Sequence, residues 1–354
     1  MNKISTASIA PTVTSAFIGA GFVSGQELWQ FFGVFGKTGI FTLFLSLILL
    51  GILCAIFMHY CKSTKNYYLD TAVLGSAPKW VNGVFCACEM ILYFFLGVIM
   101  TSGFTALVDS FTSSGVALAA GAVFALVTGI SLFFGLGGVI RLSSVFIPLL
   151  VLSTVVISVI TLAKNGIQIP EAGEIEAENP LLKFPLLSCF LSLSYNFFGS
   201  VGIMAPLTEK AKNSKQLVIS SVISTVFLVV IAVSILLSTF TTGMHDKALP
   251  MLEISKAIGL PFAIIYAILL SLAMYSCSFS SSVCIVLFAE KKLLHTKKRK
   301  IIFILLYMLM VYTVSTVGFS DLISTVYPIF GYVGFILIFI VIYNAVTNRR
   351  KPNV

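Results

Sequence analysis

The feature that most constrains this chain is a set of apolar segments, each about 20 residues long, that recurs along the whole sequence. A helix of that length crosses a hydrocarbon core of roughly 30 Å. Lipid offers no partner to backbone amides, so such segments have to be helical. Because 58% of the residues are apolar and only 10% are charged, a soluble fold would expose far too much apolar surface. The sequence therefore predicts an all-α integral membrane protein.

We predict ten transmembrane helices from apolar segments that are bounded by Gly, Pro or charged residues. They cover residues 7–35, 38–61, 80–109, 115–134, 139–163, 184–209, 215–242, 260–289, 300–317 and 321–346. A short interfacial helix is expected over Tyr67 to Gly75, and a helix on the membrane surface over Asp246 to Gly259. We interpret residues 1–354 as a single transmembrane domain.

Lys and Arg are distributed unevenly over the segments between these helices. If the N-terminus is cytoplasmic, all but five of the 22 basic residues lie on the cytoplasmic side, and the five are Lys37, Lys164, Lys183, Lys247 and Lys256. The positive-inside rule then predicts a multi-pass protein of the plasma membrane with both termini in the cytoplasm. This arrangement also explains the net charge of +9 without nucleic acid, so the expected partners are the lipid bilayer and a small-molecule substrate.

The first predicted helix contains three glycines within seven residues, Gly19, Gly21 and Gly25, and then Gln26 and Glu27. Each glycine costs up to about 1 kcal/mol relative to alanine in a helix. The pattern has two interpretations. The glycines let neighbouring backbones approach closely, or the helix is broken near Gly19 to Gly21 and its freed backbone groups line a polar cavity. We favour the broken helix, because polar residues follow at membrane depth.

The sixth predicted helix repeats this theme with Ser192, Ser194 and Asn196, followed by two glycines and a proline. Two interrupted helices, each opening a block of five, are typical of inverted-repeat transporters with a binding site at the bilayer midplane. The repeats are expected to cover residues 7–163 and 184–346. A block with an odd number of helices inserts in opposite orientations in its two copies.

The segment GAGFVSGQELWQFF at residues 19–32 resembles the opening motif of the YkvI family of bacterial membrane proteins. That family is similar to the LeuT fold of the amino acid–polyamine–organocation superfamily. The resemblance implies a five-plus-five inverted repeat, a solute held between broken first and sixth helices, and ion-coupled alternating access. It implies that residues 18–21 form the unwound part of the first helix and that residues 190–194 lead into the break of the sixth. Phe22 stands where sodium-coupled neurotransmitter-type relatives carry Asn, which argues against a sodium ion in contact with the substrate.

Glu27 and Glu89 are the two acids that we place well inside predicted helices. A charged side chain there costs a few kcal/mol or more, so each is either functional or hydrogen-bonded as part of the structure. Glu89 and Tyr93 are four residues apart and share a helix face. In the resembling fold that helix lines the substrate cavity. The expected substrate-binding residues are Gly19, Ala20, Gly21, Glu89, Tyr93, Ser192, Ser194 and Asn196.

The eighth predicted helix carries a run of hydroxyls from Ser276 to Ser282. Such hydroxyls bond back to their own helix, or they bind a hard cation together with carbonyls from another helix. The resemblance places a sodium site between the first and eighth helices, which matches Ser280 and Ser281 with the carbonyls of Ile18 and Ala20. Glu27 and Glu89 keep proton coupling open as the alternative. No cofactor is expected beyond the sodium ion or the proton.

These features together predict an ion-coupled secondary transporter of a small solute, an amino acid or a related carboxylate or zwitterion. The N-termini of half-helices favour a carboxylate, and Glu89 suits an ammonium group. The alternative is a permease-like receptor subunit that binds a small solute without transporting it. We do not expect an enzyme or a pump with its own ATPase, because the sequence contains no H-E-x-x-H, G-x-S-x-G or Walker motif.

Overall fold

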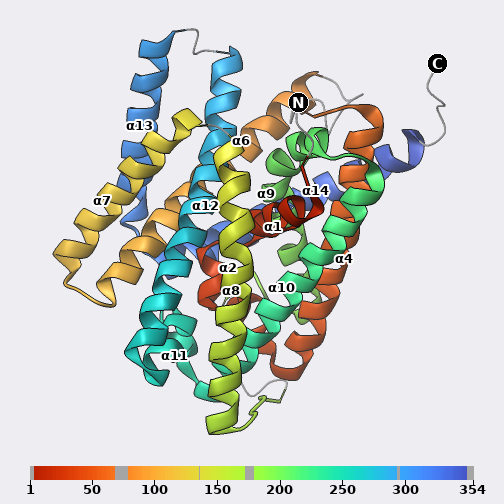
Figure 1. Cartoon of the computed structure of the whole chain (residues 1–354). Coiled ribbons are helices and arrows are strands. Elements are labelled where there is room, and N and C mark those ends of the chain that lie inside the picture. Colours follow the sequence, from red (N-terminus) through yellow and green to blue (C-terminus); the bar gives the residue numbers. More distant parts are fainter. Residues whose placement is uncertain (1–3, 68–78, 135, 172–178, 293–295, 349–354) are drawn as a thin grey trace.

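The computed structural model describes residues 4–67, 79–134, 136–171, 179–292 and 296–348, and every regular element in these ranges is a helix (Figure 1). The helix predicted over Tyr67 to Gly75 falls outside the described residues from position 68 onward. The predicted surface helix is present as α11, Pro250–Ile258, which buries Met251, Leu252 and Ile254 against the bundle.

The first predicted helix is divided into three short helices and a 3-10 turn, and the next four are long. In chain order the elements are α1 (Thr6–Phe17), α2 (Ala20–Ser24), α3 (Gln26–Phe31), η1 (Gly33–Phe35), α4 (Gly36–Thr64), α6 (Lys79–Asp109), α7 (Ser114–Ser131), η2 (Leu132–Phe134) and α8 (Leu136–Asn165). The second block has α9 (Pro185–Lys210), α10 (Ser214–Thr242), η3 (Met244–Asp246), α11, α12 (Leu260–Lys292), α13 (Lys297–Ser315) and α14 (Phe319–Asn348). Each of the ten predicted segments therefore corresponds to helical structure.

Eight helices in the described part of the chain are long and apolar enough to cross a membrane. The structure explains why the other two predicted helices, the first and the ninth, do not belong to this group. The first is interrupted, so that its longest piece has 12 residues. The ninth, α13, has 19 residues and opens with four consecutive basic residues, Lys297 to Lys300, which lower its hydropathy. The chain is thus a multi-pass membrane protein, as predicted.

Hydrogen bonds between distant segments show which helix ends lie together. At one end of the bundle the Ile4 amide donates to the Lys210 carbonyl at 3.1 Å, and the Lys62 ammonium donates to the Ala211 carbonyl at 2.8 Å. At the other end the Lys37 amide donates to the Pro170 carbonyl at 3.1 Å. The chain crosses the bundle between these ends, so α1 and α9 start from opposite ends, as inverted repeats require.

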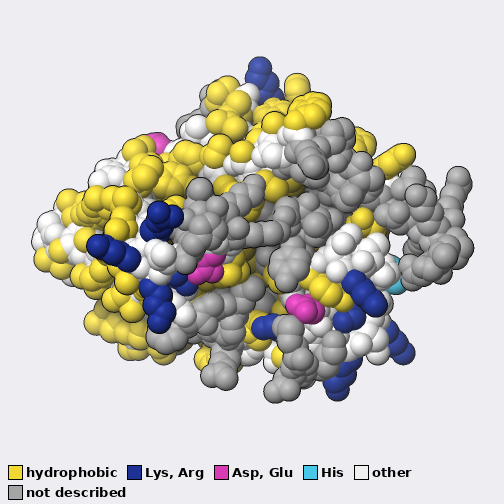
Figure 2. All heavy atoms as spheres, turned by 90° about the horizontal axis from the view of Figure 1, so that it is seen from above, with side chains coloured by type: hydrophobic (Ala, Val, Ile, Leu, Met, Phe, Trp, Pro, Cys, Tyr) yellow, Lys and Arg dark blue, Asp and Glu magenta, His cyan; other side chains and the backbone are white. Residues whose placement is uncertain are grey.

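The end that holds the start of α1 is rich in basic side chains, and we call it the basic end. Figure 2 looks onto it and shows dark blue Lys and Arg side chains on both sides of the face. The described exposed or half-buried ones are Lys62, Lys65, Lys210, Lys212, Lys215, Lys297, Lys298, Arg299 and Lys300. The opposite end carries Glu171, the α6–α7 turn and α11. This asymmetry agrees with the orientation predicted from the loops, which stays a prediction.

The predicted break in the sixth helix is wrong, because α9 is one continuous helix from Pro185 to Lys210. Its glycines do not have a positive φ. They serve close packing instead, since a Cβ at Gly202 would lie 2.3 Å from the Tyr93 hydroxyl and one at Gly199 would touch Leu92. Asn196 donates within the helix to the Ser192 carbonyl at 3.0 Å. In this helix the small residues let α6 approach closely.

Candidate functional site

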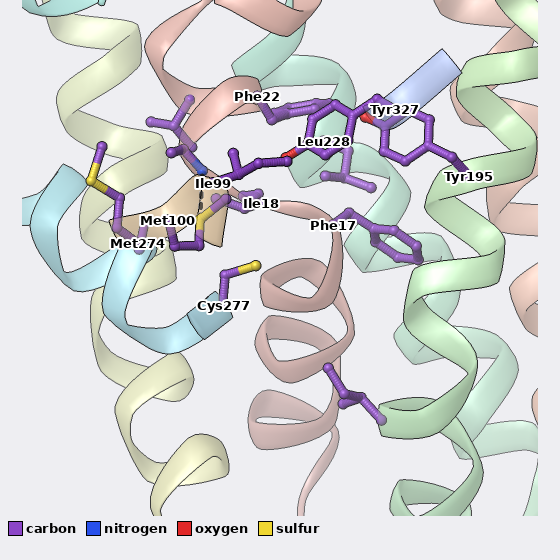
Figure 3. Packing of buried hydrophobic residues seen from close by; sticks show 14 of the residues in the cluster. Phe17, Ile18, Phe22, Ile99, Met100, Tyr195, Leu228, Met274, Cys277 and Tyr327 are labelled. Carbon is purple, nitrogen blue, oxygen red and sulfur yellow. Dashed lines mark hydrogen bonds between the residues drawn. The ribbon is translucent and has the colours of Figure 1, made fainter. Parts of the chain in front are cut away.

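The first helix is broken between α1 and α2, as the glycine pattern predicted. α1 ends at Phe17, Ile18 leaves the helical region with ψ of 87°, and Gly19 is extended with φ of −96° and ψ of 179°. A helix end leaves backbone groups without intrahelical partners. The Ala20 amide donates to the Met100 sulfur of α6 at 3.1 Å, drawn dashed in Figure 3. A thioether is a weak acceptor, so this amide is only weakly satisfied.

A second interruption follows at Gly25, which the sequence analysis did not predict. Gly25 has φ of +93°, in the left-handed region that favours glycine. It separates α2 from α3 and begins the short helix that carries Glu27. Gly21 gives this acid space, because a Cβ there would lie 3.2 Å from Glu27 Oε2. The glycines of the motif thus break the helix twice and fold the Glu27 carboxyl back against α2.

Glu27 is buried, with only 3% of its surface exposed. The Tyr195 hydroxyl of α9 donates to Glu27 Oε1, and the neighbouring Asn196 amide also hydrogen-bonds this carboxyl. The Tyr195 ring stacks on the Tyr327 ring of α14, with centroids 4.6 Å apart. Three helices that are distant in sequence therefore meet around one carboxyl group.

A small cavity of about 20 Å³ lies at this junction. Its lining comes from the break, α6, α9, α12 and α14: Ala16, Phe17, Gly19, Glu27, Leu92, Leu96, Tyr195, Asn196, Gly199, Cys277 and Tyr327. Figure 3 shows Cys277 beside the end of α1, near Phe17 and Met100. A cavity of this size holds about one water molecule, so a solute enters only when the lining side chains move apart.

A larger vestibule of about 680 Å³ lies on the side of this cavity that faces the opposite end. Gln26, Gln30, His245 and Ser324 are among its lining residues. His245 stacks on Trp29 with ring centroids 4.1 Å apart. The buried oxygens Gln26 Oε1 and Gln30 Oε1 and the His245 Nδ1 atom have no hydrogen-bond partner among the described residues. Gln26, which lines the vestibule, directly precedes Glu27, which lines the small cavity, so the two spaces adjoin.

The predicted site residues are brought together only in part. Gly19, Glu27 and Asn196 meet at the cavity, with Ile18, Ala20 and Gly21 directly around the break. Ser192 accepts the Asn196 hydrogen bond, and Ser194 packs against Gly334 of α14. Tyr195, Cys277 and Tyr327 were missed, although Tyr195 adjoins Asn196 and Cys277 lies inside the hydroxyl-rich segment.

Glu89 and Tyr93 lie beside the cavity and do not line it. Leu92 and Leu96 are the α6 residues that face the cavity. Glu89 is nearer the start of α6 and hence nearer the basic end. The Tyr93 hydroxyl donates to Glu89 Oε1 at 2.7 Å, which fits the shared helix face that the spacing predicted.

The hydroxyls predicted to bind sodium bond within their own helix. Ser280 donates to the Ser276 carbonyl at 2.6 Å, and Ser281 donates to the Cys277 carbonyl at 3.0 Å. A different group of buried hydroxyls joins three helices next to the break. Ser143 of α8 donates to Ser15 of α1 at 2.8 Å and lies 3.4 Å from the Ser276 hydroxyl of α12.

Two blocks of five helices in opposite orientations, with a first helix broken beside a buried cavity, are the arrangement of the LeuT fold. The solved structure of MhsT in complex with L-phenylalanine matches with a TM-score of 0.68 and 16% identity, covering 100% of this chain and 94% of that one. The inward-facing conformation of Mhp1 matches with a TM-score of 0.60 and 14% identity, over 100% and 79% of the two chains. These matches confirm the predicted fold.

The chain is similar over its full length to the uncharacterized membrane protein YkvI of Bacillus subtilis (strain 168). The two sequences are 25% identical over an alignment of 361 positions, which covers 99% of each chain. This confirms the resemblance found in the glycine motif. No protein-family model matches the sequence.

Proposed function

We propose that this protein is a secondary transporter that binds a small solute at the α1–α2 break and moves it by alternating access. The observation that carries the proposal is the position of Glu27. This buried acid lies at a broken helix, between a polar vestibule on one side and packed helices on the other. Intramembrane acids at such positions mark solute and ion pathways.

The lining of the cavity supports a solute with an amine group. Glu27 provides a negative charge, and a buried carboxylate is best compensated by a cation that also donates hydrogen bonds to it. Phe17, Leu92 and Leu96 provide apolar surface for the rest of the solute. We therefore propose an amino acid or a related zwitterion, with its ammonium group at Glu27. Contrary to the sequence prediction, α9 offers no half-helix N-terminus at this level to bind the carboxylate.

The test is uptake of radiolabelled amino acids into proteoliposomes that contain the purified protein. We expect Glu27→Gln to lower uptake at least about tenfold, since the carboxamide keeps the size of the side chain and removes its charge. Glu253→Gln is the matched control, because Glu253 lies on α11 and pairs with Lys256 at 2.9 Å, away from the cavity. Equal uptake by the Glu27→Gln variant would reject the site. Solute binding without accumulation would favour a receptor.

We propose sodium as the coupling ion, in the space between α1 and α12. A hard cation needs several oxygen ligands. Ser15, Ser143 and Ser276 place three buried hydroxyls there, and the broken helix adds carbonyl oxygens at its end. This arrangement supports Ser276 more than Ser280 and Ser281, whose hydroxyls are engaged within α12. Proton coupling through Glu27 is the competing proposal.

A further inference from the structure

Glu89 is a second buried acid, and the solute site does not use it. Its side chain has no exposed surface. Oε1 accepts the Tyr93 hydroxyl hydrogen bond at 2.7 Å, whereas Oε2 is buried and has no hydrogen-bond partner in the described part of the chain. A carboxylate with a bare oxygen at membrane depth costs several kcal/mol, so a bound proton or another compensating group is needed there.

The Tyr93 hydroxyl connects this acid to a second helix. It accepts a hydrogen bond from the Gly202 amide of α9 at 2.9 Å while it donates to Glu89. The contact depends on glycine, because a Cβ at position 202 would lie 2.3 Å from that hydroxyl. The chain Glu89–Tyr93–Gly202 therefore holds α6 against α9.

The third helix at this cluster is α12. Cys284 of α12 is buried near both Glu89 and Tyr93. Behind it Tyr307 of α13 hydrogen-bonds Ser282 at 3.0 Å. The titratable groups around Glu89 are thus Tyr93 on its own helix, Cys284 on α12 and Tyr307 beyond, and α9 presents the backbone amide of Gly202.

The cluster of Glu89, Tyr93 and Cys284 lies between the small cavity and the basic end. Glu89 is one helical turn from Leu92, which lines the cavity, on the side where α6 begins. On this side of the cavity α6 packs against α12 and also contacts α9. The vestibule lies on the other side of the cavity, so the packing on the basic-end side is separate from the packing on the vestibule side.

We propose that Glu89, Tyr93 and Gly202 form a proton-binding latch that closes the basic-end side of the bundle. A proton on Oε2 leaves Oε1 free to accept from Tyr93, and the three helices stay packed. Loss of that proton leaves a carboxylate with a single donor, which draws in water and separates α6 from α9 and α12. The role in solute release rests on the proposed transport function, but the proton-dependent packing does not.

The latch is tested with Cys284 as a built-in reporter, in purified protein without solute. In a variant whose single cysteine is Cys284, the rate of maleimide labelling is measured from about pH 5 to about pH 9, a range that covers buried carboxyl titrations. Thiol reactivity itself rises with pH. A variant whose single cysteine is Cys88, half-buried on α6, corrects for this. We expect the Cys284 rate relative to the Cys88 rate to rise at least about fivefold, the lower range of measured couplings.

Two further variants decide the outcome. Glu89→Gln mimics the protonated acid, so its relative labelling rate should stay low at every pH. Tyr93→Phe removes the hydroxyl that joins Glu89 to Gly202, so its rate should be high at every pH. A Glu89→Gln variant with the same pH profile as the parent would overturn the latch, as would a flat profile in the parent. Neither result depends on uptake, so failure of the latch and failure of the transport proposal are distinguishable.

Discussion

The rings of Tyr195 and Tyr327 lie nearly parallel, with an interplanar angle of 10° and 4.6 Å between their centroids, and join α9 to α14 beside the small cavity. The hydroxyl of the first also donates to Glu27. Ser324, one turn before Tyr327 on α14, lines the vestibule instead. The stacked pair therefore lines the cavity next to the vestibule, and under the proposed function we expect its opening to admit a solute.

Removing one of these rings should open the cavity to the vestibule. In a variant whose single cysteine is Cys277, we expect Tyr327→Ala to increase labelling of the cavity-lining thiol by a vestibule-side reagent about tenfold or more, a local opening of about 1.4 kcal/mol. Phe339→Ala is the control, since Phe339 lies on the same helix and is 72% exposed. A labelling rate equal to that of the parent would show that other residues close the cavity.

The sodium site predicted from the sequence, with Ser280 and Ser281, and the site proposed from the structure, with Ser276, predict different effects of mutation. When choline replaces sodium, we expect uptake or solute binding to fall. Ser276→Ala should weaken the sodium dependence about tenfold, because it removes one of few oxygen ligands, whereas Ser281→Ala should leave it near that of the parent. The reverse order would restore the site predicted from the sequence. Activity that does not depend on sodium would leave proton coupling through Glu27.

The orientation is tested by adding single cysteines to a cysteine-free variant in sealed cells. We expect Thr296→Cys, at the basic end, to be protected from an impermeant thiol reagent added outside, and Asp246→Cys to be labelled. Both positions are exposed and lie at opposite ends of the bundle. Labelling of position 296 with protection of position 246 would reverse the proposed orientation.

Gly39 of α4 should be intolerant of substitution. A Cβ at this position would lie 1.8 Å from the Phe32 carbonyl oxygen, and this backbone atom cannot rotate away. Overpacking of this kind costs about 1–3 kcal/mol, so Gly39→Ala should lower the unfolding temperature in detergent. Gly115→Ala, where a Cβ meets no atom within 4 Å, should leave it nearly unchanged. Equal unfolding temperatures would mean that α4 shifts to relieve the contact.

The fold was predictable because span length, Lys and Arg distribution and the glycines of the first helix are local properties. The difference between the two glycine-containing helices is not local. Gly25 takes a positive φ and ends a helix, whereas Gly202 stays helical because it faces the Tyr93 ring of another helix. Sequence composition does not separate these two uses of glycine, since they depend on what packs against each residue.

In the site, too, only the features that depend on neighbouring residues in the sequence were predictable. The position of Glu27 beside the break follows from its own segment. The partners of Glu27 come from α9 and α14, more than 160 residues away, as the 168-residue separation between Glu27 and Tyr195 shows. The i, i+4 pair Glu89 and Tyr93 was correctly paired, but the spacing gave no information on the depth of the pair relative to the break.

The two interruptions of the first helix also bear on how the chain enters the membrane. α1, α2 and α3 have 12, 5 and 6 residues, and each is too short to span the hydrocarbon core alone. Within Gln26–Thr64 the most apolar 18-residue window has a mean hydropathy of 2.9. Gly39 brings α4 against the Phe32 backbone at the end of α3. We therefore expect the first crossing to partition into lipid as a hairpin with α4, which supplies the hydrophobicity that the broken helix lacks.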